Sequence, residues 1–263
     1  MGNIERVDYE TLYVEKHLDE RYAVVTLHRP DSLNAGSPTM FHEIGEVMKG
    51  FEDDDQVRAV VLTGHGEKSF SAGADLGGMT FDKMSNCYWF IRRCNEAFEA
   101  IERLPKVVIA AVNGYAFGFG LEIALVCDIV LASDNARFGL REMNHGLLPA
   151  VTVTRGLDIL GRRRVAYMAF TSDDVSPAEL RDWGMINTVV PREQLVEEYS
   201  ALAARIANRA PLAIAATKRL INKGAGAHYR EAENTMPGLF ASEDVVEGRR
   251  AFEERREPVF GER

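Results

Sequence analysis

The chain of 263 residues has few cysteines, no long apolar run and no excess of positive charge. No segment approaches the roughly 18 to 20 consecutive apolar residues that a membrane-spanning helix needs. Cys87, Cys94 and Cys127 lack C-x-x-C spacing, which argues against a disulfide framework and a zinc ribbon. Residues 1–19 are rich in charge and lack the apolar stretch of a secretory signal. We therefore expect a soluble cytoplasmic protein with reduced cysteines and no membrane partner.

The net charge of -9 argues against nucleic acid as the main partner. Nucleic-acid binding needs a clustered basic surface, because the protein must neutralise phosphates. The basic runs at residues 162–164 and 249–250 are short and typical of solvated helix faces. We expect no nucleic-acid partner, whereas a small anionic ligand can still be held by a few cations or a helix N-terminus.

Several common catalytic motifs are also absent. The sequence contains no G-x-x-x-x-G-K-[ST] phosphate loop, no H-E-x-x-H pair and no serine within G-x-S-x-G. We therefore predict neither a metal site, nor a P-loop, nor a nucleophile elbow.

The N-terminal half alternates β-rich runs with amphipathic helical stretches. Runs rich in Val, Ile and Leu predict buried strands at residues 22–28, 57–63, 107–112 and 129–132. Helical spacing of apolar residues predicts helices over residues 39–51 and 84–104. Alternation of this kind indicates an α/β fold with mostly parallel strand pairing.

After Pro149 the pattern changes to consecutive helices. They are predicted over residues 162–170, 176–183, 192–208, 211–223 and 229–240, with one short strand at residues 185–190. Ser176, Pro177 and Glu179 read as an N-cap, a first-turn proline and a capping-box acid.

The length allows either one sizeable core or two modest domains. The chain contains no low-complexity linker and no internal repeat of about 20 to 50 residues. We expect a core domain over residues 1–200 and a C-terminal helical region over residues 201–263 that pack as one unit.

Two glycine-bearing turns follow predicted strands, at residues 69–76 and 113–122. Small residues there let a ligand approach the main chain, and a helix beginning at about Gly118 would aim free N–H groups at the same place. Either turn alone is better explained as an ordinary tight turn, whereas the two together could build an oxyanion hole.

In order and spacing, these segments resemble the crotonase (enoyl-CoA hydratase/isomerase) superfamily. The resemblance extends from about residue 12 to the end and is carried by residues 29–35, 69–76, 108–114, 127–129, 136–139, 146–149 and 251–260. It implies a crotonase-type α/β spiral of β-β-α turns with a C-terminal helical trimerisation region. It also implies homotrimers that commonly pair into homohexamers. Apolar side chains available for packing between subunits are Leu239, Phe240, Val245, Val246 and Phe252.

The resemblance also implies the roles of individual residues. The thioester oxygen would be held by the backbone N–H groups of Ala74 and Phe119, which stabilise the charge that develops on it. Glu122 and Glu142 occupy the positions of the two hydratase glutamates, the first deprotonating water and the second protonating the α-carbon. The remaining substrate-binding positions are Asn34, Ala35, Ala72, Gly73, Asp75, Leu76, Gly118 and Ala150.

We interpret the chain as an acyl-CoA hydratase or dehydratase, that is, a hydro-lyase of fatty-acid metabolism. It would add water to a 2-enoyl-CoA or eliminate it from a 3-hydroxyacyl-CoA, and because CoA belongs to the substrate no separate cofactor is expected. Alternatives within the superfamily are a double-bond isomerase and a hydrolase that cleaves C–C or thioester bonds. An alternative from another class is a catalytically silent acyl-CoA-binding subunit.

Three departures from the superfamily pattern bear on this choice. Phe119 replaces the usual middle glycine of a G-G-G run, residues 149–154 replace Pro-Gly-Ala-Gly-Gly-Thr, and Arg141 replaces the proline before Glu142. The Phe119 ring can project into the acyl site, which would favour short acyl groups, or pack under the helix as core.

Overall fold

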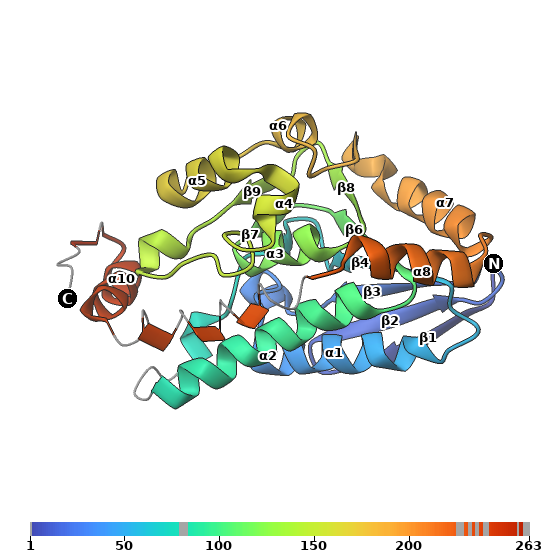
Figure 1. The fold of residues 1–263 in the computed structure, drawn as a ribbon, viewed down its shortest axis with the longest axis horizontal. Coiled ribbons are helices and arrows are strands. Elements are labelled where there is room, and N and C mark those ends of the chain that lie inside the picture. The colour runs from blue at the N-terminus through green and yellow to red at the C-terminus, as the bar shows by residue number, and fades with distance from the viewer. Residues whose placement is uncertain are drawn as a thin grey trace.

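Two β-sheets form the centre of the molecule, and helices cover both faces of the larger one (Figure 1). The structure is a computed structural model that describes residues 2–78, 84–224, 229–230, 233–234, 237–238, 242–256 and 258–259. In sheet order, the larger sheet contains β1 (Ile4–Asp8), β2 (Leu12–His17), β3 (Tyr22–Leu27), β4 (Ala59–Gly64), β6 (Val107–Val112), β8 (Ile129–Ser133) and β10 (Thr188–Val190). The smaller sheet contains β5 (Ser69–Ser71), β7 (Tyr115–Phe117) and β9 (Arg137–Gly139).

From β4 to β9 the chain alternates between the two sheets. β4, β6 and β8 pair in parallel within the larger sheet, and β5, β7 and β9 pair in parallel within the smaller one. The helix α2 (Met84–Arg103) follows β5, and α3 (Phe119–Val126) follows β7. The predicted spiral of β-β-α turns is therefore confirmed.

The other helices surround this spiral. They are α1 (Pro38–Glu52), α4 (Gly156–Leu160), α5 (Arg162–Thr171), α6 (Pro177–Asp182), α7 (Leu195–Ala207), α8 (Pro211–Ile221) and α10 (Glu243–Glu254). Short 3-10 turns lie at η1 (Pro30–Ser32), η2 (Leu76–Gly78), η3 (Glu142–His145) and η4 (Arg192–Gln194). The capping box predicted before α6 is present, since Ser176 accepts from the Glu179 N–H and Glu179 accepts from the Ser176 N–H.

Alternate residues of the larger sheet face two separate apolar clusters. Val25 and Val60 belong to the main cluster, which includes the buried faces of α1 and α2. Val24 and Val61 belong to the second cluster, which includes Leu195 of α7. Because successive strand residues point to opposite faces, these strands are apolar at most positions and read as nearly continuous apolar runs in the sequence.

Most elements with a long apolar pattern lie where they were predicted. The predicted strands correspond to β3, β4, β6, β8 and a shorter β10, and the predicted helices to α1, α2, α5, α6, α7 and α8. The helix predicted over residues 229–240 lies partly outside the described residues. The pairing is parallel from β3 to β10, as predicted, whereas the unpredicted strands β1 and β2 are antiparallel.

The C-terminal helix α10 packs partly against its own chain. Val245 is buried in the main cluster. It is therefore not available for the subunit contact that the sequence led us to expect. Val246 and Phe252 are exposed, and Leu239 and Phe240 lie outside the described residues. Among the described residues, no helix combines the length and apolarity needed to cross a bilayer.

Candidate active site

A pocket of about 110 Å³ lies between α2, the N-terminal end of α3 and the segment that follows η3. Ala74 and Phe119 line it, as do Glu122 and Glu142. Residues from four separate segments of the sequence therefore meet at one cavity.

The Ala74 N–H group lies on the side of its segment that faces away from Gly36. Gly36 and Ala74 form an isolated parallel bridge, in which the Gly36 N–H donates to Gly73 O and the Asp75 N–H donates to Gly36 O, both at 2.8 Å. Because neighbouring N–H groups of an extended segment point in opposite directions, the intervening Ala74 N–H is directed away from this bridge. It is available as a hydrogen-bond donor in the pocket.

The Phe119 N–H group belongs to the first turn of α3. A helix leaves its first N–H groups without intrahelical acceptors, and its N-terminus carries partial positive charge. The first intrahelical bond here runs from the Glu122 N–H to Gly118 O at 2.9 Å. Gly118 has φ 47°, a left-handed backbone conformation that favours glycine, and a Cβ atom there would lie 2.5 Å from Glu142 Oε1 and would displace that carboxylate.

Glu122 is held in the pocket by the turn that follows Pro149. Its Oε1 accepts hydrogen bonds from the Val151 N–H at 2.8 Å, the Thr152 N–H at 3.0 Å and the Thr152 hydroxyl at 3.4 Å. One carboxylate oxygen is thus fixed by three donors.

Glu142 begins the η3 turn on the other side of the pocket. Its Oε2 is buried and has no hydrogen-bond partner among the described residues. A buried acceptor without a partner is costly when charged, so the protonated form of this carboxyl is favoured.

The two carboxyl groups differ in their electrostatic setting. Burial and, after it, the neighbouring Glu122 charge together raise the pKa of Glu142 to about 8. Burial also raises the pKa of Glu122, but the bonds from Thr152 and Val151 oppose this effect. Since adjacent carboxylates resist a second ionisation, the pair can hold one proton near neutral pH, on Glu142.

Comparison with known proteins identifies the family. The Enoyl-CoA hydratase/isomerase family profile matches residues 19–263. The chain belongs to the enoyl-CoA hydratase/isomerase family. It is 37% identical over 241 residues to the short-chain-enoyl-CoA hydratase of Clostridium acetobutylicum, covering 90% of this chain and 92% of that protein. It is 38% identical over 245 residues to the carnitinyl-CoA dehydratase of Escherichia coli K12, covering 90% and 93%.

A solved structure agrees with this assignment to the enoyl-CoA hydratase/isomerase family. The enoyl-CoA hydratase of Mycobacterium avium subsp. paratuberculosis superposes with a TM-score of 0.85 at 33% identity, covering 97% of this chain and 100% of that one. The crotonase-type fold inferred from the sequence is confirmed.

The structure brings together some of the positions that the family resemblance implied. Those that line the pocket, besides the two donors and two glutamates, are Ala72, Gly73, Leu76, Gly118 and Ala150. Asn34, Ala35 and Asp75 are not among the residues that line this pocket.

These three residues instead form a hydrogen-bonded frame behind the Ala74 segment. The buried Asn34 side chain donates to Ser69 O at 2.9 Å and His65 O at 3.0 Å. The Arg29 guanidinium donates to Ala35 O at 2.6 Å and to Asp75 Oδ2 at 2.8 Å. Their contacts tie the turn after η1 to the turn that presents Ala74.

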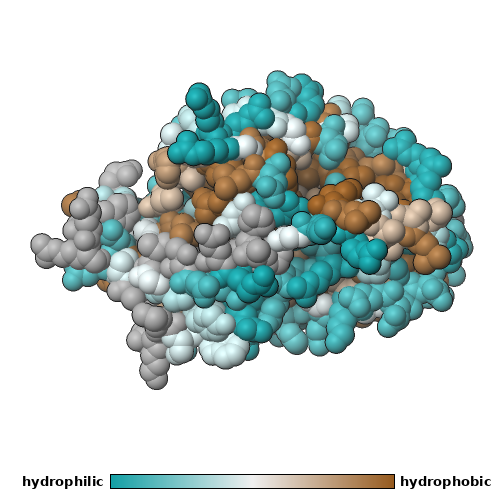
Figure 2. All heavy atoms as spheres, viewed as in Figure 1, coloured by the Kyte–Doolittle hydropathy of each residue, from teal (hydrophilic) through white to brown (hydrophobic). Residues whose placement is uncertain are grey.

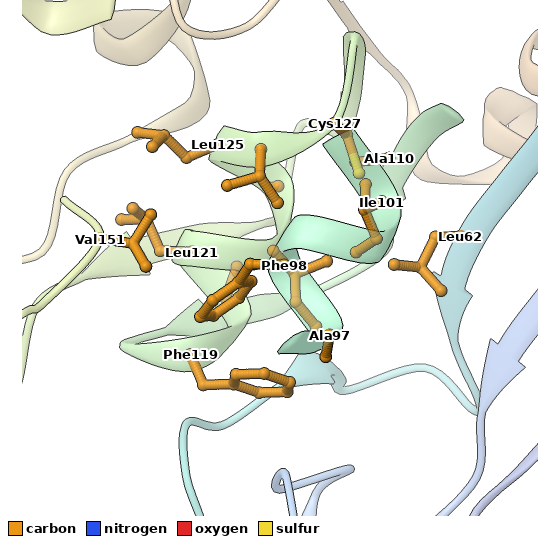
Figure 3. Packing of buried hydrophobic residues seen from close by; sticks show 14 of the residues in the cluster. Leu62, Ala97, Phe98, Ile101, Ala110, Phe119, Leu121, Leu125, Cys127 and Val151 are labelled. Atoms are coloured by element: carbon orange, nitrogen blue, oxygen red, sulfur yellow. The ribbon is translucent and has the colours of Figure 1, made fainter. Parts of the chain in front are cut away.

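The Phe119 side chain is packed into the core. Its ring is 3% exposed and lies 4.7 Å from the Phe41 ring and 5.4 Å from the Phe98 ring, measured between centroids. Figure 3 shows Phe98 and Phe119 beside each other between α2 and α3. Of the two placements that the sequence left open, the structure has the core placement, and Phe119 is also among the residues that line the pocket.

The pocket contains residues that the sequence analysis did not select. They are Phe90, Ile91, Cys94, Asn95, Phe98, Phe117, Arg141, His145, Leu147 and Leu148. Most of the first five follow helical spacing on one face of α2, which reads as ordinary core until the packing of α2 over α3 is known. In the part of the chain that the structure describes, no three His, Cys, Asp or Glu side chains cluster as a metal site would require.

Proposed function

We propose that the protein is a hydro-lyase that interconverts a 2-enoyl-CoA and a 3-hydroxyacyl-CoA. The observation that carries this proposal is that Glu122 and Glu142 meet, at one mainly apolar pocket, two backbone N–H groups that have no acceptor among the described residues. Hydratase and dehydratase are also the activities named for the relatives from Clostridium acetobutylicum and Escherichia coli.

Hydration begins with binding of the thioester oxygen to the Ala74 and Phe119 N–H groups. Water adds to the β-carbon, the C–C double-bond electrons move toward the carbonyl, and negative charge develops on the thioester oxygen. Donors fixed before the reaction stabilise this charge without reorganisation, and each is worth about 3 kcal/mol in comparable sites.

The two glutamates then divide the proton transfers. Glu122, ionised and oriented by the turn after Pro149, takes a proton from the attacking water. Glu142, protonated because of its burial, gives its proton to the α-carbon. Transfer of the water proton from Glu122 back to Glu142 restores the starting state, and the reverse sequence eliminates water.

The departures from the superfamily pattern are compatible with turnover. Replacement of glycine by Phe119 keeps the amide donor, because the ring packs into the core. Val151 is fully buried, and its N–H together with that of Thr152 supports Glu122. These contacts argue against the alternative of a catalytically silent acyl-CoA-binding subunit.

A second candidate is dehydration of a cationic acyl group, the activity named for the carnitinyl-CoA dehydratase relative. The observation that favours it is the aromatic lining of the pocket by Phe90, Phe98 and Phe117 beside the two carboxyl groups. Aromatic faces attract quaternary ammonium groups, with a contribution of about 0.5 to 2 kcal/mol per contact.

We further propose a homotrimer or homohexamer that works in the cytoplasm without a separate cofactor. Figure 2 shows apolar patches, interrupted by hydrophilic residues, on the face where α4, α5 and α8 lie. Leu157, Phe170 and Leu220, one from each of these helices, are exposed. Apolar area of this extent supports an interface between copies of the chain. Within each copy, residues 1–200 would form the spiral core, and residues 201–263 would supply contacts to neighbours.

The test is an acyl-CoA panel whose products are identified by mass spectrometry. The panel includes crotonyl-CoA, longer 2-enoyl-CoAs, a 3-enoyl-CoA and carnitinyl-CoA. Gain or loss of one water supports the hydro-lyase, double-bond migration alone supports an isomerase, and free CoA supports a hydrolase. CoA-ester binding without any product across the panel would contradict the proposal.

A further inference from the structure

The turn that holds Glu122 is a compact unit closed by its own hydrogen bonds. The Val153 N–H donates to Pro149 O at 2.9 Å, and the Gly156 N–H donates to Val151 O at 3.2 Å. The amides at Val151 and Thr152 point from this unit to Glu122 Oε1. The orientation of Glu122 therefore depends on where the turn lies as a whole.

Arg155 anchors this turn through a buried ion pair. Its Nε donates to Glu102 Oε1 at 2.8 Å, and the two side chains are 12% and 4% exposed. Its Nη2 donates to Asn222 Oδ1 at 3.0 Å, just past the end of α8. The guanidinium fork thus connects the turn to α2 and to the C-terminal helices at once.

Glu102 is in turn bonded by the C-terminal part of the chain. The buried Tyr229 hydroxyl donates to Glu102 Oε2 at 2.6 Å, and Asn222 Nδ2 donates to Glu102 O at 3.1 Å. Both carboxylate oxygens of Glu102 therefore have a donor. A buried network whose members are bonded in this way is rigid, because loss of one member leaves the others unpaired.

We propose that Arg155, held by Glu102 and Tyr229, is a positioning residue for Glu122, so that docking of the C-terminal segment sets the geometry of the catalytic base. This inference rests on the proposed role of Glu122 in hydration. Arg155 acts through the Val151 and Thr152 amides and does not itself line the pocket.

The network predicts a specific change in Glu122. Burial raises the pKa of Glu122, and the amide bonds of the turn oppose that effect. If the turn shifts, these bonds lengthen and the pKa of Glu122 rises further. The acidic limb of the pH–rate profile then moves to higher pH, which a loss of stability alone would not cause.

The experiment compares Arg155→Lys, Arg155→Met and Tyr229→Phe with the control Glu43→Gln. Glu43 is another buried charged side chain, in α1, and accepts from the Glu10 and Thr11 N–H groups, both at 2.9 Å. These partners belong to neither the turn nor the Arg155 network, so its loss should destabilise the protein without moving the turn. Arg155→Lys keeps the positive charge but loses the planar guanidinium group, and Tyr229→Phe removes one hydroxyl. Because these changes are smaller, we expect both variants to fold even if Arg155→Met does not.

We expect Arg155→Met to lower kcat for crotonyl-CoA hydration by about 10- to 100-fold with a small change in KM, as misplacement of a catalytic group does. The acidic limb of the kcat–pH profile should move to higher pH in Arg155→Met, and by a smaller amount in Arg155→Lys and Tyr229→Phe. Glu43→Gln should keep the pH–rate profile of the wild-type protein. Variants of Arg155 and Tyr229 with lowered melting temperature but an unmoved acidic limb would overturn the proposal.

A second measurement separates this inference from the proposed function. Infrared titration of the unliganded protein follows carboxyl protonation, and Glu122→Gln identifies the Glu122 band. A rise in the Glu122 pKa on Arg155 substitution supports the positioning role even if no enoyl-CoA is hydrated. An unchanged Glu122 titration contradicts it, whatever the activity of the unchanged protein.

Discussion

The Phe119 ring occupies the space that a side chain at Gly36 would need. A Cβ atom at Gly36 would lie 2.6 Å from Cδ1 and Cε1 of Phe119 and equally close to Cε1 of Phe41. The main chain of Gly36 also forms the bridge that directs the Ala74 N–H into the pocket. Gly36 therefore contacts the segments that carry both proposed oxyanion donors.

This contact predicts that substitutions at Gly36 and Phe119 are coupled. Gly36→Ala should destabilise the protein by about 1 to 3 kcal/mol, because a methyl group is forced against two packed rings. Phe119→Gly should cost about 3 kcal/mol or more for the lost ring. The double variant should lose less than the sum, as measured by urea unfolding in a double-mutant cycle. Strict additivity would mean that the ring and Gly36 do not share this space.

The same variant tests whether Phe119 selects the acyl group. Because the ring packs between Phe41 and Phe98, we expect Phe119→Gly to lower stability while leaving the ranking of enoyl-CoA chain lengths unchanged. The measurement is kcat/KM over a series of chain lengths, at a temperature where the variant is folded. A gain for longer chains relative to crotonyl-CoA would assign the ring a role in specificity.

The sequence predicted those parts of the fold in which one pattern persists over many residues. Strands such as β4 and β6 are buried on both faces and read as continuous apolar runs. The three-residue strands of the smaller sheet are too short to show any periodicity, and β1 is fully exposed. Their positions depend on tertiary pairing, which no local pattern encodes.

The candidate site likewise combines features that the sequence indicates with features that depend on tertiary structure. The turns that carry Ala74 and Phe119 stood out because they join glycine to the end of a strand-like run. The convergence of Glu122 and Glu142 followed only from the family resemblance, since the chain between them forms β8 and β9. The support of Glu122 by the Val151 and Thr152 amides was invisible, because backbone donors carry no signature in the sequence.

Conservative substitution of the two glutamates should abolish most of the activity. Glu122→Gln and Glu142→Gln should each lower hydration by at least about 100-fold, because acid–base transfer is lost while shape is kept. A suitable control is Glu43→Gln in α1, a buried glutamate that accepts from the Glu10 and Thr11 N–H groups, outside the pocket. It should affect stability rather than turnover. Near-normal hydration by both pocket variants would refute the two-glutamate mechanism.

The exposed side of α10 should contribute to assembly. Val246 and Phe252 are 56% and 71% exposed in the single chain, and burial of such side chains is worth about 1.5 to 3 kcal/mol each. Sedimentation of the wild-type protein should show a trimer or hexamer at micromolar concentration. Phe252→Ser should shift the distribution toward smaller species, whereas Asn208→Ser, at the end of α7, serves as an exposed control. A stable monomer would contradict the proposed assembly.

The raised pKa of Glu142 predicts how both activity and stability depend on pH. In the proposed mechanism hydration needs protonated Glu142, so the rate should fall as pH rises through about 8, where burial and the Glu122 charge place this pKa. The unfolded chain binds this proton with the ordinary value of 4.5. A folded pKa above the unfolded one gives stability that is fully present below 4.5 and is lost progressively as pH rises through the folded value of about 8.

The variant Glu142→Gln cannot titrate at this position, so its stability relative to the wild-type protein should increase between pH values of about 5 and 9. Urea unfolding of both proteins across that range measures the difference, and parallel curves would show that Glu142 titrates normally in the folded state.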